Sequence, residues 1–73
     1  MENKQENQIG EKLERMCRER GISFYALSAV SGVALTTIMH VVDGSTRNPG
    51  IYTVMRLCRG LEISMADFLE DLE

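Results

Sequence analysis

The chain has 73 residues, of which 44% are hydrophobic and 26% charged, and its formal net charge is −3. This length allows one small domain, and the composition is that of a globular protein rather than a disordered chain. No apolar run approaches the ~20 residues of a membrane span, and the polar first residues do not resemble a signal peptide. We therefore expect a cytoplasmic protein with no membrane partner.

The charges are unevenly distributed along the chain. Residues 1–20 hold five acidic and five basic residues, whereas residues 21–61 hold one aspartate against three arginines. Residues 62–73 hold five acidic residues and no basic one. The middle of the chain is therefore mildly basic, and it is the segment best suited to face nucleic acid.

The residues that usually carry catalysis or bind metal are scarce. Cys17 and Cys58 each fall in register with apolar neighbours, which predicts two reduced, buried thiols. With a single histidine in the chain, they make a poor zinc site. No nucleophile–base pair or glycine-rich phosphate loop is present. We expect no enzyme activity, no metal, no cofactor and no small-molecule substrate.

Apolar residues recur at helical spacing in five segments and do not alternate as they would in strands. The first segment begins at Ile9, after a flexible tail over residues 1–8, and ends at Gly21. The next three cover residues 24–30, 34–42 and 51–60, and Ser64 is suited to cap a fifth. The sequence thus predicts an all-α fold, with one compact five-helix domain over residues 9–73.

The apolar side of each segment supplies core candidates. In the first three helices they are Ile9, Leu13, Met16, Cys17, Leu27, Val30, Ile38, Val41 and Val42. In the last two they are Ile51, Val54, Met55, Leu57, Cys58, Leu61, Met65, Phe68, Leu69 and Leu72.

The second and third segments flank a short break that contains Gly32. A glycine there permits a sharp turn, and Leu27, Ile38 and Val41 are spaced to hold two helices at a steep angle. This arrangement is typical of a helix-turn-helix, a common DNA-binding unit.

Three stretches occur in an informative order: FYALSAVSGVALTTIMHVVDG, RNPGIYTVMRLCRGLEIS and MADFLEDL. In this combination the chain resembles the lambda-repressor-like helix-turn-helix family, the Cro and xenobiotic-response-element type of small bacterial transcriptional regulators. The resemblance covers about residues 9–72. It implies a compact five-helix domain whose third helix enters the major groove of double-stranded DNA. It is also compatible with a homodimer that places two such helices one DNA turn apart.

Matched by position, the resemblance places the recognition helix on residues 34–42. The DNA-binding candidates are Ser23, Phe24, Ala34, Leu35, Thr36, Thr37, Met39, His40, Arg47 and Asn48. Thr36 is suited to bind a base edge or pack on a thymine methyl, and His40 to donate to guanine or phosphate.

The other candidates have different expected roles. Leu35 is suited to an apolar contact with thymine, and Thr37 is expected near the DNA backbone. Arg47 and Asn48 match loop residues that contact phosphate in the family.

The chain departs from the family at several of these positions. Leu35 and Met39 stand where glutamine, arginine, lysine or serine is typical, and Phe24 replaces a glutamine that often holds a phosphate. Asp43 would face phosphate with the wrong sign, and Glu62 occupies a turn that is usually glycine. An apolar exposed patch also suits a protein partner. The alternative function is therefore a protein-interaction module on the same fold, such as an antirepressor, antitoxin or co-regulator.

Overall fold

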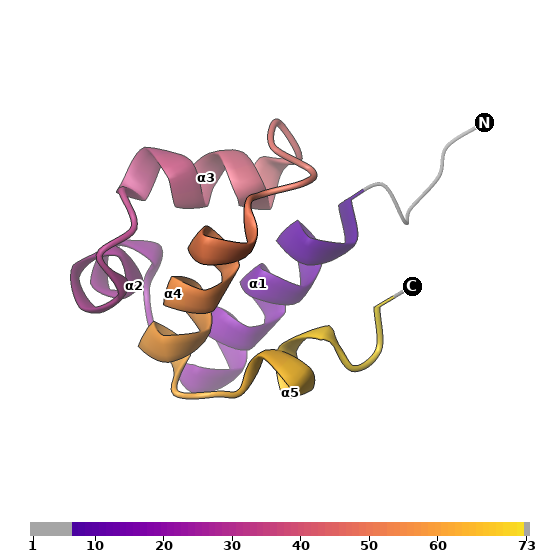
Figure 1. Cartoon of the computed structure of the whole chain (residues 1–73). Coiled ribbons are helices and arrows are strands. Elements are labelled where there is room, and N and C mark those ends of the chain that lie inside the picture. Colours follow the sequence, from indigo (N-terminus) through magenta and orange to yellow (C-terminus); the bar gives the residue numbers. More distant parts are fainter. Residues whose placement is uncertain (1–6, 73) are drawn as a thin grey trace.

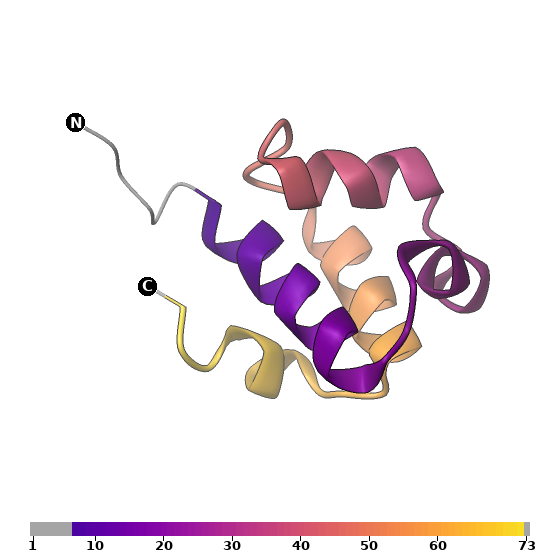
Figure 2. The ribbon, with the colours of Figure 1, turned by 180° about the vertical axis from the view of Figure 1, so that it is seen from behind.

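The computed structural model describes residues 7–72, and these residues form five helices and no strand. The helices are α1 (Gln8–Arg20), α2 (Phe24–Ser31), α3 (Leu35–Asp43), α4 (Ile51–Leu61) and α5 (Met65–Leu69). The predicted all-α class is confirmed. In both views α3 lies across one end of the molecule and α5 at the opposite end, with α1 and α4 between them (Figures 1 and 2).

The bounds of the first four helices differ from the predicted ones by at most one residue. The first helix begins at Gln8, which the sequence assigned to a tail over residues 1–8, and residues 1–6 of that predicted tail lie outside the described part of the chain. The third helix begins at Leu35, because Ala34 has an extended backbone and acts as the N-cap.

Two serines begin helices as the sequence predicts. The Ser23 hydroxyl accepts a hydrogen bond from the Ala26 N–H at 3.0 Å, and the Ser64 hydroxyl accepts one from the Asp67 N–H at 3.0 Å. Each bond satisfies one backbone donor that the first turn of a helix leaves unpaired.

One apolar core joins the five helices. Besides Cys58, its largest fully buried side chains are Leu13, Leu27, Ile38, Val41, Leu57 and Phe68. Burying a side chain of this size stabilises the folded state by about 1.5–3 kcal/mol. Phe68 supplies the only fully buried side chain of α5 among the described residues, so it anchors this short helix to the rest of the domain.

The two cysteines lie in this core as free thiols, as predicted. Burial raises the pKa of both Cys17 and Cys58, because a thiolate would lose its hydration there. Both therefore behave as small apolar residues.

The prediction of burial in the core was wrong for three residues. Val30 is 63% exposed and Ile51 is 70% exposed, while Leu69 is also exposed. Ile51 is the first residue of α4 and precedes the part of that helix that reaches the core. Val30 lies on the last turn of α2, at the rim of a surface hollow that it shares with Ile22 and Leu61.

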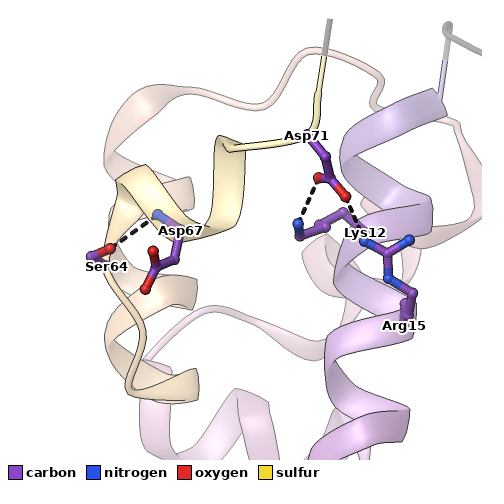
Figure 3. Close-up of polar contacts among 5 residues, drawn as sticks. All are labelled: Lys12, Arg15, Ser64, Asp67 and Asp71. Carbon is purple, nitrogen blue, oxygen red and sulfur yellow. Dashed lines mark hydrogen bonds and ion pairs between the residues drawn. The ribbon is translucent and has the colours of Figure 1, made fainter.

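A buried lysine ties α1 to the end of the chain. Lys12 is 8% exposed, and its ammonium donates to the Asp71 carboxylate at 2.7 Å. Arg15, one turn further along α1, donates to the other oxygen of Asp71 at 3.1 Å. Figure 3 shows this carboxylate between the two basic side chains, just beyond α5.

Candidate nucleic-acid interface

Helices α2 and α3 form the predicted helix-turn-helix. Gly32 ends α2 in the left-handed region, at φ 76°, which a residue with a side chain adopts only with strain. Leu27, Ile38 and Val41 are all fully buried, so the residues predicted to hold the two helices together do lie in the core.

The turn before α3 is held by side chains from two helices. The Ser28 hydroxyl donates to the Val33 carbonyl at 2.7 Å, and the Ser31 hydroxyl accepts from the Val33 N–H at 3.1 Å. Arg56 on α4 donates to the Gly32 carbonyl at 3.3 Å, with its guanidinium 5.0 Å from the centre of the Tyr52 ring. These contacts place a positive charge beside the turn that leads into α3.

The other end of α3 is held by the start of α1 and by its own loop. The Asn7 side chain donates to the Val42 carbonyl at 3.3 Å. The Thr46 N–H donates to the His40 carbonyl at 2.9 Å, so the loop folds back onto the last turn of α3. Arg47, an exposed residue of the same loop, follows directly.

Asp43 takes part in the same loop. Its carboxylate accepts the Ser45 N–H at 2.8 Å. Hydrogen bonding by Ser45 is the main cause that lowers the pKa of Asp43. Asp43, whose charge is ill-suited to a phosphate surface, therefore has a structural role, which is to close the turn after α3.

The outward side of α3 carries the predicted reading residues. Thr36 and His40 are exposed, Leu35 is 37% exposed and Met39 is 44% exposed, whereas Thr37 is half-buried. Residues four apart share a face of a helix. Leu35 and Met39 thus form an apolar ridge beside a polar ridge of Thr36 and His40. The predicted exposure of these four side chains is confirmed.

The remaining candidates lie around this helix or support it. Ala34, Arg47 and Asn48 are exposed, at the start of α3 and in the loop after it. Ser23 is exposed but its hydroxyl caps α2, and Phe24 is half-buried against the core. Contact of any of these residues with DNA remains a prediction.

Sequence reasoning missed two residues that shape this surface. Arg56 was counted only as a charge, although its spacing of four residues from Tyr52 is a signal for ring stacking on a helix. Asn7 was assigned to the tail, and its bond to α3 joins segments 35 residues apart. No local sequence pattern predicts a contact between residues so far apart in the chain.

Between residues 7 and 72, no three His, Cys, Asp or Glu side chains gather where they could hold a metal ion. Within the same range, no helix has the length and apolar character needed to cross a bilayer.

A family model for the Cro/C1-type HTH DNA-binding domain matches residues 12–72, which include α1 from its second turn onward and the whole of the other four helices. No curated protein and no solved structure matches the chain.

Proposed function

Because the chain belongs to the family of Cro/C1-type helix-turn-helix DNA-binding domains, we propose that it is a sequence-specific transcriptional regulator. In this proposal α3 enters the major groove of double-stranded DNA and reads base edges, while flanking residues hold phosphates. In this proposal the protein acts in the bacterial cytoplasm and is not an enzyme.

The observation that supports this best is the placement of charge around α3. The helix itself carries no lysine or arginine. Arg56 lies beside the turn that precedes it, and Arg47 lies in the loop that folds back on its end. A reading surface without fixed positive charge is thus flanked by an arginine at each end, which suits base contacts between two phosphate contacts.

We propose Arg47 as the main phosphate contact, with Asn48 beside it. Thr36 and His40 supply hydrogen bonds to base edges, and the exposed Ala34 lies at the start of the same surface. Ser23 and Phe24 lie at the start of α2, and we propose that they contact a phosphate there, where backbone N–H groups attract it. Thr37, half-buried, is assigned to the DNA backbone.

A homodimer would bring two reading helices to one face of the duplex, about 34–36 Å apart. Pairing matters here because two arginines per domain give a weak attraction to phosphate. The proposal therefore predicts an operator with two related half-sites. Shifting one half-site by five base pairs, about half a helical turn, should weaken binding to the level of a single half-site.

The test is selection of bound duplexes from a random library, followed by titration of the selected DNA at several salt concentrations. With about two phosphate contacts per protomer, log K should fall with log [salt] at a slope near −2 per protomer bound. Arg47→Ala should weaken binding to all sequences alike and make this slope shallower. Arg20→Ala, an exposed change at the end of α1, serves as the control and should leave both unchanged.

One result of these experiments would reject the proposal. If no sequence is enriched and binding shows no dependence on salt, the protein does not act through DNA.

A protein-interaction module is the second candidate, favoured by one observation. Leu35 and Met39 remain exposed on a helix that carries no lysine or arginine and ends at Asp43. Calorimetric binding of an added protein partner that Leu35→Ser abolishes, together with failure to enrich DNA, would select this function over DNA binding.

A further inference from the structure

The exposed side of α3 has an unusual composition for a surface that reads DNA. The helix sequence is LTTIMHVVD, which contains no arginine, lysine, asparagine or glutamine. Arginine and lysine are the side chains that bind guanine with two hydrogen bonds, and asparagine and glutamine do the same for adenine. The helix therefore lacks the side chains that discriminate most strongly between bases by forming two hydrogen bonds with one base.

Apolar groups occupy the position where those side chains would act. Leu35 and Met39 lie one turn apart on the outward side and keep 37% and 44% of their surface exposed. Ala34, also exposed, adds a methyl group just before the helix. In a helix-turn-helix the N-terminal part of the second helix contacts the bases. Ala34 and Leu35 lie at this end of α3, and Met39 lies one turn further along.

The major groove offers one apolar group to such a surface. This is the 5-methyl group of thymine, which alanine and other apolar side chains contact. Four residues along a helix rise by about 6 Å. That distance corresponds to nearly two steps of about 3.4 Å along one DNA strand. The ridge of Leu35 and Met39 therefore has the length to touch methyl groups on neighbouring or next-neighbouring base pairs.

We infer that this domain recognises its operator chiefly through thymine methyl groups, which pack against Leu35 and Met39 in the major groove. The inference rests on the proposed function and specifies the DNA that this site selects. Thr36 and His40, on the adjacent ridge, then add single hydrogen bonds rather than the main discrimination. Because methionine is flexible, Met39 adapts to a methyl group at more than one step.

The test replaces thymine by uracil, which lacks only the methyl group. Duplexes selected from a random library are resynthesised with uracil at the half-site thymines, or with uracil only at thymines outside the half-sites. Burying one methyl group is worth about a fourfold gain in affinity. Uracil at two contacted positions should therefore weaken binding about fifteenfold, and uracil outside the half-sites should have no effect. A second comparison places cytosine or 5-methylcytosine at the same positions, and the methylated base should bind more tightly.

Protein variants identify the side chains responsible. Leu35→Ala and Met39→Ala should each reduce the ratio of affinities for thymine and uracil DNA. Val30→Ala shortens an exposed apolar side chain on α2, at the rim of a hollow lined by the ends of α1 and α4, and should keep the full ratio. Circular dichroism confirms that each variant is folded.

The outcomes separate the two levels of the argument. If the selected DNA binds equally well with thymine or uracil, or if both alanine variants keep the full ratio, the inference is wrong although DNA binding stands. If no duplex is selected at all, the proposed function fails and the inference fails with it.

Discussion

Gly10 on α1 lies directly against the carbonyl group of Val41 on α3. A methyl group built on Gly10 would overlap the Val41 oxygen, which is backbone and cannot rotate away. Asn7, one turn earlier, donates to the next carbonyl of α3, that of Val42. The first turn of α1 therefore sets the distance and the tilt at which α3 is presented, because both contacts are made to backbone atoms.

Replacing Gly10 with alanine should destabilise the domain although alanine is the better helix former. Helix propensity alone would stabilise it by about 1 kcal/mol. The overlap with Val41 should outweigh this gain and leave a net loss of about 1–3 kcal/mol. Urea unfolding measures the difference. Glu19→Ala, an exposed change in the same helix, should stay within about 0.5 kcal/mol of the parent. A stabilised Gly10→Ala variant would contradict the close packing of α1 on α3.

The helix-turn-helix could be predicted from the sequence because its determinants are local. Helical spacing marks Leu27, Ile38 and Val41, and a glycine marks the turn between the two helices. The exposed ridge of Leu35 and Met39 follows from the same periodicity. These features depend on neighbours within a few turns, which is the range over which sequence patterns are informative.

The contacts that hold α3 in place could not be predicted in this way. Gly10 and Gly60 both lie inside helices, where a glycine costs about 1 kcal/mol and so suggests a reason in packing. A side chain at Gly60 would press on Leu27 and Ser31 of α2. Which helix approaches each glycine depends on the tertiary arrangement. The exposure of Ile51 was missed for a related reason, since an apolar residue at a helix end has the same spacing whether or not the core extends that far.

Replacing Glu62 with glycine should stabilise the domain. Glu62 ends α4 in the left-handed region, at φ 61°, and is the only residue other than glycine with such a φ among residues 7–72. A side chain costs about 1–2 kcal/mol in this conformation, and the added freedom of glycine when unfolded offsets part of the gain. We expect a net gain of about 1 kcal/mol, or a rise in Tm of about 4–8 °C.

Glu62→Ala is the matched control for that experiment. It removes the same charge but keeps a Cβ atom in the left-handed region, so it should not reproduce the stabilisation. If Tm rises equally in the two variants, the cause is relief of charge repulsion rather than relief of backbone strain.

Replacing Arg56 with methionine should loosen the turn before α3. The change removes the hydrogen bond to the Gly32 carbonyl and the stacking on Tyr52, and should cost about 0.5–1.5 kcal/mol. Amide exchange at Gly32 and Val33 should become faster than in the parent. Arg59→Met, an exposed change on the same helix, should affect neither quantity. Unchanged exchange at the turn in Arg56→Met would show that the serine hydrogen bonds hold it without help from α4.

The contact between Lys12 and Asp71 should respond asymmetrically to mutation. Asp71→Asn leaves the largely buried Lys12 ammonium without its carboxylate, so Tm should fall. Lys12→Met keeps the volume and removes the buried charge, so it should be less harmful. The double variant Lys12→Met/Asp71→Asn should recover much of the loss in Asp71→Asn. Additive effects in this cycle would mean that the two side chains do not interact in solution.

The same contact makes the stability of the domain depend on pH. The hydrogen bond from Lys12 is the main cause that lowers the pKa of Asp71 in the folded state, with a smaller contribution from Arg15. A carboxyl whose pKa is lowered on folding stabilises the protein at pH values above its pKa in the unfolded chain, which is about 3.9 for aspartate. This contribution is lost as the pH falls through the lower, folded pKa. The difference in Tm between the parent and Asp71→Asn should therefore be constant near pH 6 and shrink below about pH 4. In the Lys12→Met background the shrinkage should be much smaller, because the main cause of the shift has been removed. A parent–variant difference that stays constant down to the lowest pH at which the domain remains folded would exclude the ion pair as its source.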